Sequence, residues 1–140
     1  MHSKVTTFEN RAAWLGYLGI LPFLGGVILL LNPSTAAVAL EGIANYAAII
    51  LTFVGAIHWG RAMSSASPYL LGLSVVPSLV AWCTLFLAAK LALPILICGF
   101  LALYIFDHRE YQDAAWFQRL RAHLTLSVCA LLMLSWLTTF

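Results

Sequence analysis

The chain carries very little charge. Only 9% of its 140 residues are Asp, Glu, Lys or Arg, with five acidic and seven basic side chains in all. A soluble domain usually has about 25% charged residues, because water must solvate its surface. This shortage excludes a water-soluble globule of ordinary composition. The net charge of +2 comes from scattered basic residues, which argues against a nucleic-acid partner.

Cysteines and catalytic motifs are scarce too. The three cysteines all lie inside apolar runs, and none belongs to a CxxC pair: Cys83, Cys98 and Cys129. The sequence has no HExxH or CxxCH motif and no Ser/His/Asp arrangement. We therefore predict no catalytic residues, no metal site and no disulfide framework, so that an enzyme is the least favoured class. One alternative stays open: a metal at the cytoplasmic edge held by His58 with His108 or His123.

Apolar residues dominate what is present. They make up 63% of the sequence, and the mean hydropathy is +0.96. About 20 apolar residues in a helix cross the roughly 30 Å of hydrocarbon in a bilayer. We therefore predict an all-α integral membrane bundle of five transmembrane helices, forming a single domain over residues 1–140. The predicted spans cover residues of about 12–31, 40–60, 69–89, 91–106 and 121–138.

Polar residues and prolines mark the expected connections between spans. Asn32-Pro33-Ser34 ends the first span, because proline disfavours helix in the residue before it. Ser64 to Pro68 predicts the turn after the second span, and Lys90 a short turn after the third. The polar stretch 107–123 is the only sizeable predicted loop. Its residues Trp116, Phe117 and Leu120 fall at helical spacing and suggest an interfacial turn leading into the fifth span.

The basic residues predict the orientation. Lys and Arg are retained on the cytoplasmic side of short loops, whereas Asp and Glu contribute little. Six of the seven basic residues fall on one side of the predicted bundle: Lys4, Arg11, Arg61, Arg109, Arg119 and Arg121. Only Lys90 falls on the other side. We therefore expect a cytoplasmic N-terminus and an external C-terminus.

The segment from Gly55 to Arg61 is the most unusual part of an apolar span. It places His58, Trp59 and Arg61 within one turn of the predicted cytoplasmic end. An ionisable ring inside a membrane is costly, which makes His58 a candidate for ligand binding or proton transfer. The more ordinary interpretation is a helix end, with Trp59 as an interface anchor and Arg61 as the inner flank. Gly55 and Gly60 would allow a neighbouring helix to approach closely.

Two further features add candidates. Asp107 ends the fourth span at the depth of His58 and Arg61, so it could pair with either, although a solvated loop is the simpler interpretation. Pro22 and Pro77 fall near the middle of the first and third spans. Each proline removes a backbone hydrogen bond and bends its helix, which leaves room for a central cavity or produces bent but solid packing.

The order of several motifs points to a known family. Gly55-Ala56-Ile57-His58-Trp59-Gly60 is preceded by Leu18 to Phe23 and followed by Val75 to Trp82, Phe106-Asp107 and Trp116 to Arg121. Together these segments resemble the transmembrane-protein-69-like family, whose shared domain has no known function. The resemblance implies a five-span bundle in a bacterial inner membrane, or in the mitochondrial inner membrane of a eukaryote. It implies these candidate functional positions: His58, Trp59, Pro77, Ser78, Asp107 and Arg119.

Two functions follow as expectations. The first is a non-catalytic accessory, assembly or stabilising subunit of a membrane complex, or a small homo-oligomer, whose partners would be lipid and other subunits or itself. The alternative is a binding or transport protein for protons or for a small apolar ligand of the quinone or tetrapyrrole class. The cofactor is unknown. The candidate ligand-binding residues are His58, Trp59, Arg61, Pro77, Ser78, Trp82, Asp107 and Arg119.

Overall fold

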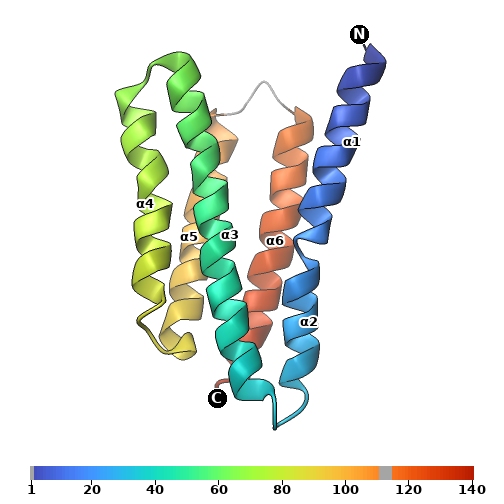
Figure 1. The fold of residues 1–140 in the computed structure, drawn as a ribbon, viewed down its shortest axis with the longest axis vertical. Helices are drawn as coiled ribbons and strands as arrows, with labels where there is room; N and C mark the ends of the chain where they lie inside the picture. The colour runs from blue at the N-terminus through green and yellow to red at the C-terminus, as the bar shows by residue number, and fades with distance from the viewer. Residues whose placement is uncertain (1, 111–114) are drawn as a thin grey trace.

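The chain folds into a bundle of helices that run up and down beside one another (Figure 1). The computed structural model describes residues 2–110 and 115–140, with side chains from Thr7 onward. The described residues form α1 (His2–Leu18), α2 (Leu21–Leu30), α3 (Ala36–Ser65), α4 (Pro68–Thr84), α5 (Ala89–Glu110) and α6 (Ala115–Leu137). The all-α prediction is confirmed, and the two ends of the chain lie at opposite ends of the bundle.

The first span consists of two helices. α1 and α2 are separated at Gly19 and Ile20, and together they give an apolar span over Thr7–Leu30. Pro22 lies in the first turn of α2, where its missing N–H is not needed. The expected bend at Pro22 within a continuous helix is therefore wrong, because the chain breaks before the proline. The Tyr46 hydroxyl donates a hydrogen bond of 3.1 Å to the Gly19 carbonyl at this break.

The third span is shorter than expected. α4 ends at Thr84, whereas the predicted span continued to residue 89. Residues 85–87 form a turn although they are apolar, so hydropathy alone did not mark the helix end. Lys90 was expected in that turn but lies in the first turn of α5. Its ammonium group sits 4.2 Å from the centre of the Phe140 ring, which ties α5 to the C-terminus.

The predicted loop over 107–123 is mostly helical. α5 continues to Glu110 and α6 begins at Ala115, so both helices extend into this polar stretch, and residues 111–114 lie outside the described part. The fourth and fifth spans therefore do not stop at residue 106 or start at residue 121. Polarity misled the prediction here, because Asp107 and Arg121 pair with each other inside the bundle.

α3 and α4 form a tight helical hairpin. Ala66 closes α3 with a left-handed φ of 50°, and Pro68 then starts α4. Further along the hairpin, Gly55 of α3 faces Pro77 of α4. A Cβ added at Gly55 would lie 2.8 Å from both Cβ and Cγ of Pro77, which is closer than atoms can pack. The absence of a side chain at Gly55 therefore permits this approach of the two helices.

α3 is the central helix of the bundle. It packs against α2, α4, α5 and α6, while α1 packs against α6. Small side chains on α3 allow these close contacts. The core combines these with large apolar side chains from α2, α3, α5 and α6: Phe23, Ala44, Ala47, Ala48, Leu51, Leu93, Leu96, Phe100 and Leu132.

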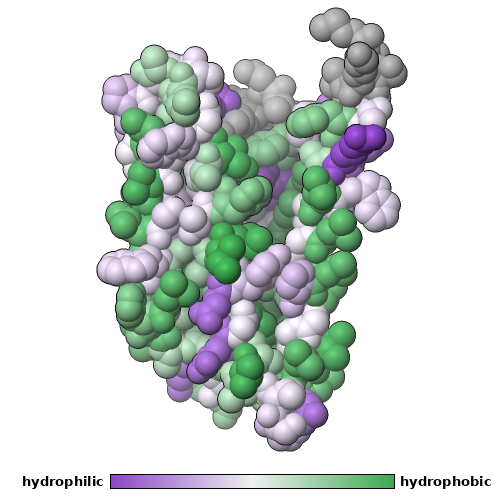
Figure 2. Space-filling view, in the orientation of Figure 1, coloured by the Kyte–Doolittle hydropathy of each residue, from purple (hydrophilic) through white to green (hydrophobic). Residues whose placement is uncertain are grey.

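The surface of the bundle is largely apolar. Many large hydrophobic side chains are exposed, and green hydrophobic residues are spread along the whole length of the face seen in Figure 2. Four spans are long and apolar enough to cross a membrane, namely α1 with α2, α3, α5 and α6, and α4 is a shorter apolar helix of 17 residues. A surface of this kind requires lipid as its solvent. The chain is an integral, multi-pass membrane protein.

Candidate functional site

Three ionisable side chains from three helices meet inside the bundle. His58 of α3 is fully buried, and Asp107 of α5 and Arg121 of α6 are only 3% and 6% exposed. The Nε of Arg121 donates a hydrogen bond of 2.6 Å to Oδ2 of Asp107. The Nε2 of His58 lies 3.0 Å from Oδ1 of the same carboxylate. Asp107 thus links α3 to α6, and we call these three residues the polar cluster.

Arg121 and Asp107 form an ion pair inside the polar cluster. Their short contact is a charge-assisted hydrogen bond, which is stronger than one between neutral groups. A buried charge without a partner is very costly, whereas a hydrogen-bonded pair is tolerated. The His58 ring also packs edge-on against Phe106, with ring centres 4.9 Å apart. The polar cluster is therefore a paired and oriented group buried inside the bundle.

Two polar groups beside Asp107 lack a bonding partner. Neither Nη2 of Arg121 nor Oγ1 of Thr125 has one among the described residues, and both atoms are buried. The other buried hydroxyls bond to carbonyls of their own helices: Ser74 to Leu71, Thr84 to Ala81 and Ser135 to Leu131. Thr125 is the exception. Because Arg121 and Thr125 are four residues apart on α6, their side chains lie on one face of the helix.

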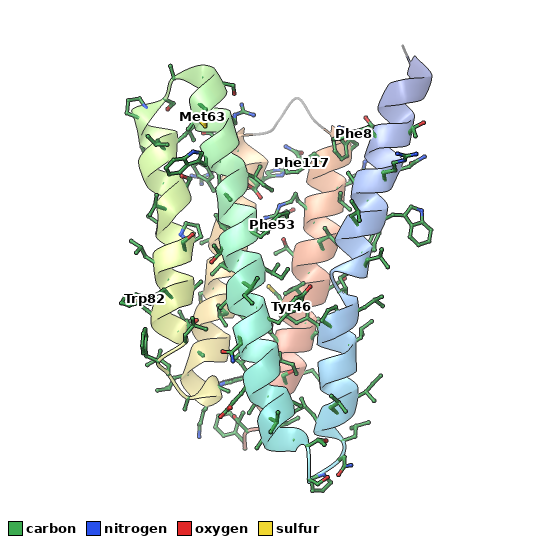
Figure 3. All side chains as sticks on the ribbon, viewed as in Figure 1. Phe8, Tyr46, Phe53, Met63, Trp82 and Phe117 are labelled. Carbon is green, nitrogen blue, oxygen red and sulfur yellow. The ribbon has the colours of Figure 1, made fainter. Side chains whose placement is uncertain are left out.

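That face of α6 borders a cavity. The cavity has a volume of about 130 Å³, and Arg121 and Thr125 are part of its otherwise mostly apolar wall. The wall is completed by residues from α1, α2, α3, α5 and α6, among them Leu15, Phe23, Phe53, Phe100 and Val128. Leu15 and Phe53 are 70% and 69% exposed, so the rim reaches the outside of the bundle. Figure 3 shows Phe53 on the side of α3 that faces α6 and α1.

A comparison with known proteins assigns the family. The model of DUF3429, a family of proteins of unknown function, matches residues 8–137. The chain belongs to the DUF3429 family. The match includes the polar cluster and the residues that line the cavity. No curated protein and no solved structure matches the chain.

Within this DUF3429 chain, two of the predicted site residues meet. His58 and Asp107 were expected at the same depth, and the structure brings them together. Arg121 was expected only to mark the orientation and to end one of the family motifs, and Thr125 was not a predicted site residue. One signal could have revealed both residues. They are spaced at i and i+4 on a helix, and the charged member lies at the start of an apolar run, where a charge needs a partner.

The other predicted site residues lie elsewhere. Trp59 and Trp82 are 47% and 58% exposed, and Trp82 points away from the bundle (Figure 3). Arg119 is exposed and donates to the Ala115 carbonyl at 3.3 Å. Pro77 is buried against Gly55 and lines a separate apolar cavity of about 270 Å³ between α3, α4 and α5.

Three other residues that the sequence suggested are half-buried or exposed. Ser78 and Arg61 are half-buried on α4 and α3. His123, one of the residues considered for a metal, is exposed, with its Nδ1 3.2 Å from the Tyr17 hydroxyl. The described part of the chain contains no group of three His, Cys, Asp or Glu side chains that could hold a metal ion.

Proposed function

We propose that this protein binds a small apolar molecule within the membrane, in the cavity beside the polar cluster. One observation carries the proposal. The mostly apolar wall of the cavity includes the residues Arg121 and Thr125, each of which has a buried polar atom, Nη2 and Oγ1, without a partner among the described residues. Apolar pockets with a few well-placed polar groups are typical of small-molecule sites.

The polar cluster would fix the geometry of this site. Asp107 holds the guanidinium of Arg121 through Nε, so that Nη2 is oriented before a ligand arrives. His58 contacts the other oxygen of the same carboxylate and so limits its rotation. Preorganised groups of this kind lower the entropic cost of binding. In this proposal Arg121 and Thr125 contact the ligand, whereas Asp107 and His58 position Arg121.

A substitution on α6 tests the binding function. Val128 is buried in the cavity wall, so Val128→Phe would fill part of the space. Leu126→Phe adds a similar ring on the exposed side of the same helix and serves as the matched control. We would extract each protein from its own membrane in a mild amphiphile and record native mass spectra. A small-molecule mass on the wild type and on Leu126→Phe, but not on Val128→Phe, supports the proposal.

Two results would overturn it. One is a bare wild-type protein that also fails to gain mass after incubation with a lipid extract of its own membrane. The other is a bound mass that Val128→Phe retains in full. Circular dichroism and the unfolding midpoint of each variant would confirm that loss of the ligand does not come from loss of the fold.

A second candidate is an accessory or assembly subunit, and one groove favours it. The groove lies between α2 and α3, has a volume of about 570 Å³, and includes Gly25, Gly42 and Val38 in its wall. A Cβ added at Gly25 or Gly42 would meet nothing within 4 Å. Small residues on an open face allow the backbone of an apolar partner helix to approach closely. A heteromeric mass in the same spectra, lost with Gly42→Leu, would support this function.

We also propose the orientation and the location that the sequence indicates. The N-terminus would be cytoplasmic, the membrane would be a bacterial inner membrane or the mitochondrial inner membrane, and the chain would be related to the transmembrane-protein-69-like proteins. The asymmetry of the basic residues supports the orientation. Ser65 and Thr138 lie at opposite ends of the bundle. Single cysteines at these positions, in a cysteine-free background, should react with an impermeant maleimide from opposite sides.

A further inference from the structure

We propose that the ligand is a neutral molecule whose head is a six-membered ring, or a group of similar size, that carries a carbonyl-type oxygen. That oxygen would accept hydrogen bonds from Nη2 of Arg121 and Oγ1 of Thr125. This inference rests on the proposed binding function and specifies the chemistry of the same site.

The requirement for an acceptor follows from the donors. A guanidinium N–H can only donate, so any group that satisfies Arg121 Nη2 must accept. The Thr125 hydroxyl can donate to the same oxygen, because a carbonyl has two lone pairs. Both atoms are buried and have no partner among the described side chains and backbone groups. Leaving buried polar groups unpaired is costly, which favours a ligand that pairs with both.

The requirement for neutrality follows from the charge balance. Asp107 already neutralises Arg121 at 2.6 Å, and both side chains are buried. A carboxylate or phosphate ligand would add a negative charge beside this neutral pair in a medium of low dielectric. A ketone, quinone or ester oxygen adds no net charge. The geometry therefore favours a neutral acceptor over an anionic one.

The size limit follows from the cavity. Its volume of about 130 Å³ is close to the roughly 150 Å³ of an engineered apolar cavity known to hold benzene. One six-membered ring therefore matches the space beside Arg121. The exposed rim at Leu15 and Phe53 gives any longer apolar tail a path into the lipid between α1 and α3.

Two nearly isosteric probes test the oxygen directly. Acetophenone, labelled with ¹³C at its carbonyl, has the shape of α-methylstyrene, in which a methylene replaces the oxygen. We would titrate both into the full chain in lipid nanodiscs and express affinity against the probe concentration in the lipid phase. We expect acetophenone to bind about 10-fold more tightly, as one hydrogen bond to a charged donor would give. Its bound carbonyl stretch should shift to lower frequency relative to empty nanodiscs.

Four variants assign the shifted band to the site. Thr125→Val should weaken acetophenone binding by about 3- to 10-fold and move the band, because one of the two donors is gone. Thr125→Ser keeps the hydroxyl and should restore the band. Thr52→Val is the matched control, because the Thr52 hydroxyl bonds to the Ala48 carbonyl and lies outside the cavity wall. Val128→Phe should abolish the shifted band.

The outcomes separate this inference from the proposed function. Equal affinity for the two probes, with loss of both in Val128→Phe, would leave a binding cavity but overturn the carbonyl requirement. A shifted band that persists in Thr125→Val and Val128→Phe would place the probe elsewhere and overturn the inference. Binding of neither probe, together with a bare native mass spectrum, would overturn both proposals.

Discussion

The two sides of α3 differ in how closely the neighbouring helix approaches and in which side chains line the space that remains. Toward α4, the helices approach until Gly55 has no room for a side chain beside Pro77. Toward α1, a cavity of about 130 Å³ reaches the outside of the bundle beside the exposed Phe53 ring. The tight side fixes the position of α3, while the loose side leaves space beside the charges of the polar cluster. Space is also present on the α4 side, where Pro77 lines the apolar cavity of about 270 Å³, but only the cavity toward α1 has Arg121 and Thr125 in its wall.

Removing the charge on Arg121 should produce the largest effect. Arg121→Met leaves the buried Asp107 carboxyl without its cationic partner, which should lower the free energy of unfolding by about 3–5 kcal/mol. The measurement is the unfolding midpoint in mixed micelles as denaturing detergent is added. The same change tests the side of α3 that faces α1, because Arg121 is part of the cavity wall there.

Two variants control for the loss of a cation as such. Arg119→Met removes an exposed arginine two residues away on the same helix and should change the unfolding free energy by less than about 0.5 kcal/mol. The double variant Asp107→Asn with Arg121→Met removes both charges and should recover part of the lost stability. If Arg121→Met and Arg119→Met are equally stable, the charge pair does not stabilise the bundle.

A pair of glycines on α3 tests the tight side. Gly55→Ala places a methyl group 2.8 Å from Pro77 and should lower the free energy of unfolding by about 1–3 kcal/mol through overpacking. A Cβ at Gly60 meets nothing within 4 Å, so Gly60→Ala should leave stability unchanged or raise it by up to about 1 kcal/mol. Thermal or detergent unfolding of both variants gives the comparison. Equal destabilisation would show that the approach of α4 at Pro77 is not the cause.

Composition predicted the helices better than it predicted their ends or their contacts. Apolar runs located the four long apolar spans and the shorter helix α4, because a lipid-facing helix must be apolar along its length. They could not place the end of α4 at Thr84, since the turn that follows is apolar as well. The basic residue at position 121 fits the positive-inside pattern, which hid its second role as the partner of Asp107.

The sequence predicted the ionisable residues His58 and Asp107 of the candidate site, but not its cavity. His58 and Asp107 could be placed at one depth from the ends of their spans. The cavity could not be predicted, because it depends on how α1 and α2 break at Gly19 and Ile20 and how α1 then leans on α6. Sequence spacing within single helices does not contain that information. Trp59 and Trp82 looked like site residues by type, but their positions on the helices turn them outward.

The smallest predicted effect concerns the hydroxyl of Thr125. Thr125→Val should leave the free energy of unfolding unchanged or raise it by up to about 1 kcal/mol, because the hydroxyl has no partner within the described structure. Thr84→Val is the comparison, because the equally buried Thr84 hydroxyl donates to the Ala81 carbonyl at 2.7 Å, and its loss should lower stability slightly. Unfolding curves of the two variants without added ligand would be compared with the wild type. A drop for Thr125→Val that matches or exceeds the drop for Thr84→Val would show that the hydroxyl already stabilises the empty bundle. Opposite signs would indicate that this position on the loose side of α3 is maintained at a cost to stability, as expected for a group kept for a ligand.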